Sequence, residues 1–96
     1  MRTVTLVHHR VADFDAWKQV FDSFTGAMRE GGIRSAHVWR DREDPNAVVV
    51  ISVFDNPEAA HAFFERDDLR EAMGNAGVDT SSLRIEFLDE VQDYTP

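Results

Sequence analysis

The hydrophobic and polar positions divide the first third of the chain into a strand-like and a helix-like segment. Residues 3–9 form a short block of β-branched and apolar residues, which is typical of a β-strand. Asp13 is a candidate N-cap, and the apolar residues after it recur at spacings of three and four, which predicts a helix that ends at Gly31-Gly32. The apolar stripe of this helix consists of Phe14, Trp17, Val20, Phe21, Phe24 and Met28.

Two further strands are predicted in the middle of the chain. Residues 33–40 alternate, with Ala36 and Val38 on one side and Ser35, His37 and Trp39 on the other. Residues 41–46 contain Asp-Pro and Asn, which indicates a hairpin turn. Residues 47–54, "AVVVISVF", are apolar on both sides of the predicted third strand except at Ser52.

A second helix and a fourth strand complete the pattern. Asn56-Pro57-Glu58 combines a cap, a proline in the first turn and an acidic residue, which predicts a helix start. An apolar stripe runs from there to Gly77, and Asp67-Asp68 is expected to break and recap the helix. Leu83, Ile85 and Phe87 then alternate with charged residues, as on a half-buried strand.

The order of these elements is β-α-β-β-α-β, which predicts a ferredoxin-like α+β fold. Such a fold has a four-stranded antiparallel sheet, with the first and third strands in the centre and two helices on one face. We expect residues 1–96 to form a single domain, with residues 92–96 as a loose tail.

The two central strands predict a homodimer. The third strand carries Val48, Val50 and Phe54 on one side and Val49, Ile51 and Val53 on the other. The helices can cover only one of these sides, so the other would expose an apolar patch larger than monomers usually tolerate. A second copy is the simplest cover.

Composition limits the possible partners and cofactors. The formal net charge is −8 and there is no basic stripe, so neither nucleic acid nor an anionic membrane is an expected partner. The absence of cysteine excludes disulfides and thiolate metal sites, no three histidines converge in the pattern, and no phosphate loop is present. We therefore expect no metal and no cofactor. The N-terminus lacks a leader pattern and no apolar run could span a membrane, which favours a cytoplasmic protein.

The adjacent His8 and His9 are the first candidates for chemistry. Successive side chains of a strand point to opposite faces, so the two histidines should have different roles. His9 shares a face with Val7 and Val11, and Val11 leads directly into the first helix, so we expect His9 on the helix side. There a neutral imidazole could accept a proton from a substrate, while His8 would be structural.

Further candidate site residues come from the aromatic positions and the second strand. We expect Trp17, Trp39 and Phe64 to line a substrate pocket with His9, and His37 to act as a second proton-transfer group. Each of these residues, taken singly, also fits a packing or surface role.

Three stretches, "LVHHRVADFDAWKQVFD", "DPNAVVVISVFDNPEAAHAFF" and "LREAMGNAGV", resemble the dimeric α+β barrel superfamily. Its members include cofactor-free antibiotic-biosynthesis monooxygenases, small polyketide cyclases, haem-degrading monooxygenases and stress-responsive barrel proteins. The resemblance implies a homodimeric, cofactor-independent enzyme that cyclises or oxygenates a planar polyketide-like or phenolic substrate. A non-catalytic ligand-binding or stress-associated dimer is the alternative.

Two branches of that superfamily match less well. The haem-degrading branch has a helical iron-ligating histidine, and His61 is helical, but His61 comes early in its helix and the branch's strand-one asparagine is missing. The plant polyketide cyclases pair a histidine with a tyrosine, whereas the single tyrosine here, Tyr94, is in the predicted tail.

Overall fold

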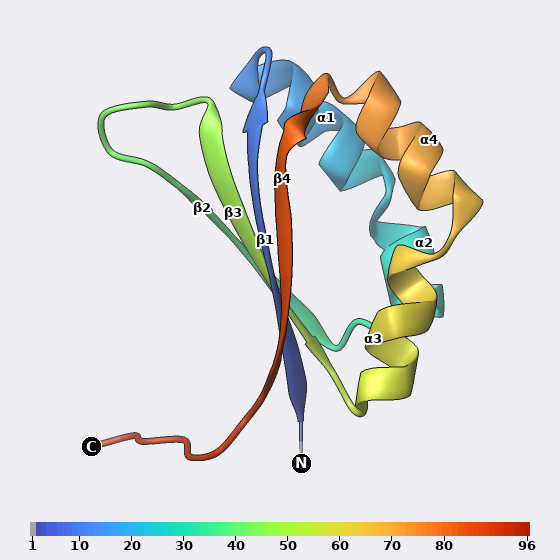
Figure 1. Ribbon diagram of the computed structural model, residues 1–96, viewed down its shortest axis with the longest axis vertical. Helices are drawn as coiled ribbons and strands as arrows, with labels where there is room; N and C mark the ends of the chain where they lie inside the picture. The colour runs from blue at the N-terminus through green and yellow to red at the C-terminus, as the bar shows by residue number, and fades with distance from the viewer. Residues whose placement is uncertain (1) are drawn as a thin grey trace.

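The computed structural model describes residues 2–96 and has the predicted ferredoxin-like α+β fold (Figure 1). A four-stranded antiparallel sheet carries all the described helices on one of its faces. The elements in chain order are β1 (Thr3–Val11), α1 (Phe14–Ser23), α2 (Thr25–Glu30), β2 (Ser35–Arg40), β3 (Ala47–Phe54), α3 (Pro57–Phe64), α4 (Asp67–Asn75) and β4 (Val78–Asp89).

The strand order β2-β3-β1-β4 confirms the prediction that the first and third strands are central. β1 lies between β3 and β4, with Val7 opposite Val50 on one side and Ile85 on the other. The fourth strand is longer than the alternation of Leu83 to Phe87 predicts, because it continues along β1 in both directions.

The helix starts agree with the predicted caps. The Asp13 carboxylate accepts a hydrogen bond from the Ala16 amide at 3.0 Å, and the Asn56 side chain accepts one from the Ala59 amide at 2.8 Å. Both bonds satisfy amides that a helix leaves without internal partners. Within residues 2–96, no helix is both long enough and apolar enough to cross a membrane.

The first predicted helix is divided in two, which the apolar stripe did not indicate. α1 ends at Ser23 and α2 begins at Thr25. The Ser23 hydroxyl donates to the Val20 carbonyl at 2.7 Å, and the Thr25 hydroxyl donates to the Asp22 carbonyl at 3.1 Å. Such bonds compete with the backbone ladder of a helix, so they favour an interruption here. The break between α3 and α4, by contrast, falls where Asp67-Asp68 predicts it.

The sheet has one buried face and one exposed face. Along β1 and β3 every second residue is buried, and those buried residues face the helices. The residues of opposite parity form the other side, which we call the open face. Its members are Val4, Leu6, His8, Ser35, His37, Trp39, Val49, Ile51, Val53, Arg84, Glu86 and Leu88.

Residues 90–96 follow β4 without regular structure and extend away on the side of the open face (Figure 1). Arg2 forms a two-pronged ion pair with Glu90, and the Glu90 amide donates to the Arg2 carbonyl at 2.9 Å. Beyond this anchor Val91 is 93% exposed and Tyr94 is 77% exposed. This tail therefore contains an apolar and an aromatic side chain that the rest of the described chain leaves exposed.

The pairing of β1 with β4 is irregular beside His9. His8 lies opposite Arg84 and Arg10 lies opposite Asp79, so β4 carries extra residues between these two pairs. The Arg10 amide donates to the Ser82 hydroxyl at 2.8 Å, and that hydroxyl donates to the Asp79 carbonyl at 2.6 Å. The alternation of β1 itself continues through the irregularity, so His8 and His9 still point to opposite faces.

Gly31, at the end of α2, is expected to be intolerant of a side chain. A Cβ there would collide with the ring of Phe63, which is 4% exposed and packed in the core. We expect Gly31→Ala to lower the free energy of unfolding by about 1–3 kcal/mol, as overpacking usually does. Urea denaturation measures this change. Gly74→Ala is the control, because Gly74 lies in α4 with open space around it, and there the change should stabilise the protein by up to about 1 kcal/mol.

Candidate functional site

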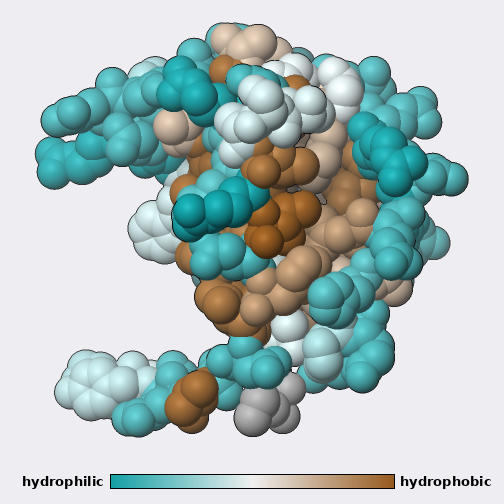
Figure 2. Space-filling model, in the orientation of Figure 1, coloured by the Kyte–Doolittle hydropathy of each residue, from teal (hydrophilic) through white to brown (hydrophobic). Residues whose placement is uncertain are grey.

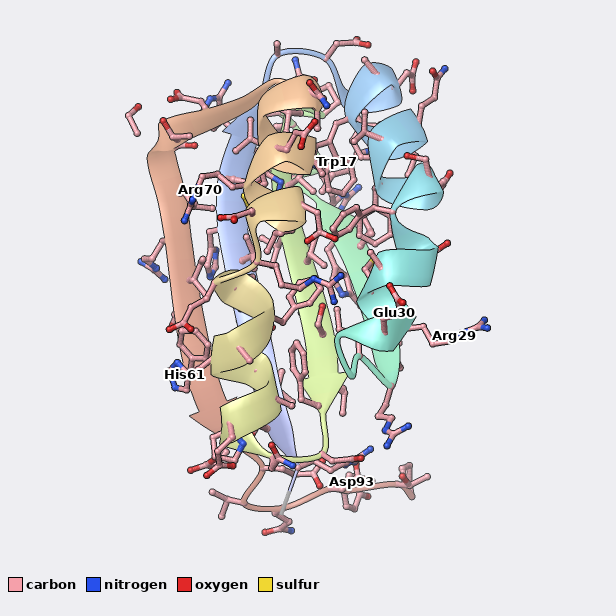
Figure 3. All side chains as sticks on the ribbon, turned by 90° about the vertical axis from the view of Figure 1, so that its right-hand side faces the viewer. Trp17, Arg29, Glu30, His61, Arg70 and Asp93 are labelled. Carbon is pink, nitrogen blue, oxygen red and sulfur yellow. The ribbon has the colours of Figure 1, made fainter. Side chains whose placement is uncertain are left out.

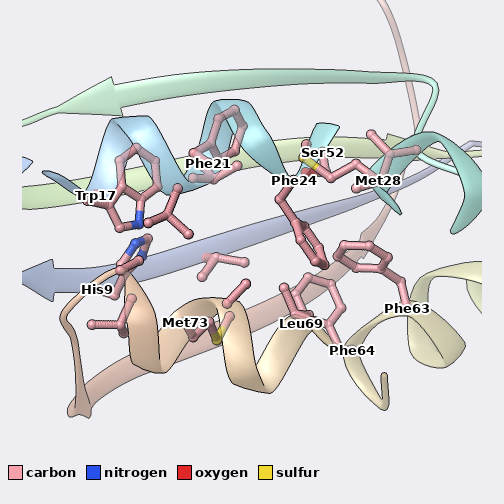
Figure 4. A pocket seen from close by; sticks show the side chains of 17 residues that line it. His9, Trp17, Phe21, Phe24, Met28, Ser52, Phe63, Phe64, Leu69 and Met73 are labelled. Atoms are coloured by element: carbon pink, nitrogen blue, oxygen red, sulfur yellow. The ribbon is translucent and has the colours of Figure 1, made fainter. Parts of the chain in front are cut away.

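A cavity of about 90 Å³ lies between the buried face of the sheet and the helices (Figure 4). Side chains of β1, β3 and all four helices line it, and nearly all of them are apolar. Figure 2 shows apolar side chains gathered in the middle of its view, between the sheet and the helical layer. The polar side chains of the lining are His9, Ser52 and the indole of Trp17.

His9 lies on the buried face of β1, as its parity predicts, and is 7% exposed. Its Nδ1 atom is buried and has no hydrogen-bond partner within residues 2–96. Burial disfavours the charged imidazolium and lowers the pKa of His9 below its ordinary value of 6.5. His9 is therefore neutral at neutral pH, and a neutral imidazole can accept a proton.

The ring of Trp17 lies beside His9, and further aromatic rings extend along the cavity. Trp17 points inward from α1 (Figure 3), with its ring centre 5.6 Å from that of His9. Trp17 also stacks on Phe21 at 5.2 Å. Farther along, Phe64 of α3 meets Phe63 edge to face at 5.3 Å. The walls are thus flat and apolar, which suits a planar ligand.

Three of the five predicted site residues line the apolar cavity together, and the other two lie outside it. His9, Trp17 and Phe64 line the cavity. His37 and Trp39 lie on the open face instead, because β2 pairs with β3 so that His37 is opposite Ile51 and Trp39 is opposite Val49. Trp39 is 60% exposed. The expectation that His37 and Trp39 line the apolar cavity is therefore corrected, but Trp39 does line a second, wider groove together with His9.

The sequence reasoning missed several residues that line the cavity. Phe21, Phe24 and Met28 were recognised as part of an apolar stripe, but the stripe does not separate core from cavity wall. Ser52 carried a clearer signal, since it is the one polar residue in the run "AVVVISVF". Its parity matches that of Val48 and Val50, which places it on the buried face.

The lowered pKa of His9 predicts a pH-dependent stability. The unfolded chain takes up a proton on His9 near pH 6.5, whereas the folded chain takes it up only at lower pH. The free energy of unfolding should therefore fall as pH decreases below about 6.5. Urea denaturation between pH 7.5 and pH 5 measures this slope, and His9→Gln should flatten it.

A wider groove of about 410 Å³ opens at the end of the sheet where the β2–β3 hairpin lies, and its lining includes His9 and Trp39 as well as His8, Arg40 and Ser82. His8 lies 3.0 Å from the Glu86 carboxylate on the open face, and Glu86 also binds Arg84 at 2.8 Å. This pairing fits the predicted structural role of His8.

Neither a metal nor haem has a set of ligands around the cavity. Within the described residues, no three His, Asp or Glu side chains converge to hold a metal ion. His61 is exposed on α3 and stacks on Phe87 with ring centres 4.1 Å apart, and it does not line the cavity (Figure 3). The chemistry open to the cavity is therefore that of a neutral imidazole, a hydroxyl and aromatic walls.

Comparison with solved structures shows the same fold in other proteins. SnoaB from Streptomyces nogalater, described as a cofactor-independent oxygenase, is 12% identical with a TM-score of 0.78, and the match covers 96% of this chain and 95% of SnoaB. A dimeric ferredoxin-like protein of unknown function from Jannaschia sp. CCS1 is 14% identical with a TM-score of 0.73, and coverage is 94% and 100%. None of the curated proteins matches this chain.

The sequence itself places the chain in a family. The sequence profile of the antibiotic biosynthesis monooxygenases matches residues 4–75, from β1 into the last turn of α4. The matched region includes His9, Trp17, Ser52 and Phe64, which line the cavity. This chain therefore belongs to the antibiotic biosynthesis monooxygenase family.

Proposed function

We propose that this protein is a cofactor-independent enzyme that removes a proton from a planar phenolic or polyketide-like substrate, which then reacts with oxygen. The observation that carries the proposal is His9, a buried neutral imidazole with an unpartnered Nδ1 in an aromatic-walled cavity. The family and the cofactor-independent oxygenase among its structural relatives support the same class of reaction.

The chemistry requires one base and a site from which water is excluded. His9 accepts a proton from a phenol or an activated methylene, and the substrate becomes an electron-rich anion. This anion reduces molecular oxygen, so that a methylene becomes a carbonyl, one oxygen atom is retained and the other leaves as water. Trp17 and Phe64 hold the ring system flat against His9 and keep water out. If the same anion attacks a carbonyl within the substrate instead of reacting with oxygen, a ring closes and the enzyme is a cyclase.

Oxygen uptake tests the proposal. A hydroxylated anthrone is a suitable probe because it is planar and carries both phenols and an activated methylene. We expect the protein, without added metal or flavin, to accelerate oxygen consumption and formation of the anthraquinone. Uptake no faster than in buffer, measured with an oxygen electrode, would contradict the proposal.

We also propose that the functional unit is a homodimer joined through the open faces. Val49, Ile51 and Val53 are only half-buried in one chain, and Leu6 lies beside Ile51 on β1. His37 and Trp39, which are on this face, are reassigned to the interface. The segment 90–96 extends on the same side (Figure 1), and it contains the exposed Val91 and Tyr94, which could contact the second copy.

One observation favours the alternative of a non-catalytic binding protein. The cavity, at about 90 Å³, is smaller than most ligand sites, which range from about 300 to 1,000 Å³. A ring system enters only if flexible side chains such as Met28 and Met73 move aside. Binding of the anthrone without turnover would favour this alternative over the enzyme.

A further inference from the structure

Ser52 is an unexpected residue in the cavity wall. It lies on the buried face of β3 between Val50 and Phe54, is 4% exposed and lines the cavity. A hydroxyl in apolar surroundings costs free energy unless it has a hydrogen-bond partner. The position therefore requires an explanation other than packing.

Thr5 adds a second hydroxyl at the same place. It lies directly opposite Ser52 on the neighbouring β1 and is 0% exposed. Its Oγ1 atom is buried and has no hydrogen-bond partner within residues 2–96. Ser52 and the unpartnered Thr5 hydroxyl next to it thus form a polar point in the sheet, and of the two only Ser52 lines the cavity, because Thr5 is fully buried.

This polar point is far from His9. His9 lies opposite Val48, four residues before Ser52 along β3, which corresponds to about 13 Å of strand. Figure 4 shows His9 and Trp17 toward one end of the cavity, and Ser52 with Phe24 and Met28 toward the other. A ligand that bridges the two ends makes one hydrogen bond of about 2.8 Å at each end. Subtracting both from the strand distance leaves roughly 7–8 Å between the two polar groups of the ligand. A fused two-ring system with substituents at opposite ends has that length.

We propose that Ser52, which lines the cavity next to the buried Thr5, binds an oxygen atom at the end of the substrate opposite to the end that faces His9. This inference rests on the proposed function and narrows its substrate class to conjugated rings that carry oxygen at the far end. Where the far oxygen is a carbonyl conjugated with the group from which His9 removes a proton, negative charge is delocalised onto that carbonyl oxygen. The Ser52 hydroxyl donates a hydrogen bond to that oxygen, so it holds the ligand in place and stabilises the charge.

Calorimetric titration with two probes tests this binding point. 2-Naphthol has one hydroxyl, and 2,6-dihydroxynaphthalene has hydroxyls at both ends of the same ring system. We expect the unmodified protein to bind the diol about two- to tenfold more tightly than 2-naphthol, the effect of one neutral hydrogen bond. Ser52→Ala should abolish this preference and leave the affinity for 2-naphthol unchanged. Ser35→Ala, at an exposed position of β2, should keep the preference.

The other outcomes separate the two proposals. If Ser52→Ala binds both probes as the unmodified protein does, or weakens both equally, the role of Ser52 is wrong while the proposed function stands. If the unmodified protein binds neither naphthol but accelerates oxygen uptake with the anthrone, this inference fails and the proposed function stands. If it binds neither naphthol and does not accelerate oxygen uptake, both fail.

Thr5→Val provides an independent measurement on the free protein. Replacing an unpartnered buried hydroxyl by a methyl group should raise the midpoint of thermal unfolding, because no hydrogen bond is lost. A lower midpoint would mean that the Thr5 hydroxyl is bonded within the fold, and it would overturn the polar point on which the inference depends.

Discussion

Replacing His9 with alanine is expected to lower the rate of enzyme-dependent oxygen uptake with a hydroxylated anthrone at least about 100-fold. General-base help is usually worth 10²–10⁴-fold, or roughly 3–5 kcal/mol of the barrier. In this cavity no acidic side chain lies in the described lining, so no carboxylate could replace the imidazole as a base. The loss should therefore be close to the full contribution of the base.

His8→Ala is the matched control for this experiment. His8 adjoins His9 in the sequence but lies on the open face, 3.0 Å from the Glu86 carboxylate. We expect this variant to retain nearly full activity. Circular dichroism should show that both variants remain folded. An unchanged rate in His9→Ala would show that His9 is not the base.

Ile51→Asp is expected to separate the homodimer or to prevent its folding. Ile51 lies in the middle of the open face, between His37 of β2 and Leu6 of β1. In a two-fold dimer the substitution occurs on both sides of the contact, so two carboxylates enter an apolar interface together. We expect the dissociation constant to rise more than about 100-fold, since even one lost isoleucine contact costs about 1.5–3 kcal/mol.

Sedimentation equilibrium measures this effect. The unmodified protein should sediment at about twice the monomer mass of 10.9 kDa, and the Ile51→Asp variant at the monomer mass if it folds. Gln19→Asp, at an exposed position on α1, adds the same charge on the helical side and should remain dimeric. A monomeric unmodified protein would contradict the proposed interface.

The fold could be predicted from the sequence because its elements carry local signals. Asp13 and Asn56 are caps that act within three residues, and β1 and β3 are short runs rich in β-branched and apolar residues, which are typical of strands. The face of His9 was also predictable, because Val11 connects β1 to α1 and thereby identifies the helix side. The division of the first helix at Phe24 was not predicted, because the apolar stripe continues across it.

The side of the sheet on which Trp39 lies depends on information that the alternation of β2 does not contain. Alternation shows that Trp39 and Val38 point to opposite faces, but only the pairing with β3 decides which of them faces the helices. A shift of one residue in that pairing would exchange the two faces. The hairpin between β2 and β3 is too long for its residues alone to determine the register, so the sequence could not show that Trp39 lies outside the apolar cavity.

The extra residues of β4 beside His9 also affect how copies of the chain can associate. β4 is an edge strand, and a regular edge can add a strand from another molecule and continue the sheet without limit. The turn-like bonds of Asp79 and Ser82 interrupt that edge, and Arg84 and Glu86 place charges along it. Ordered growth of a fibre through β4 is thereby disfavoured. A contact between open faces has no such tendency to propagate, because one two-fold pairing occupies both faces and closes the assembly.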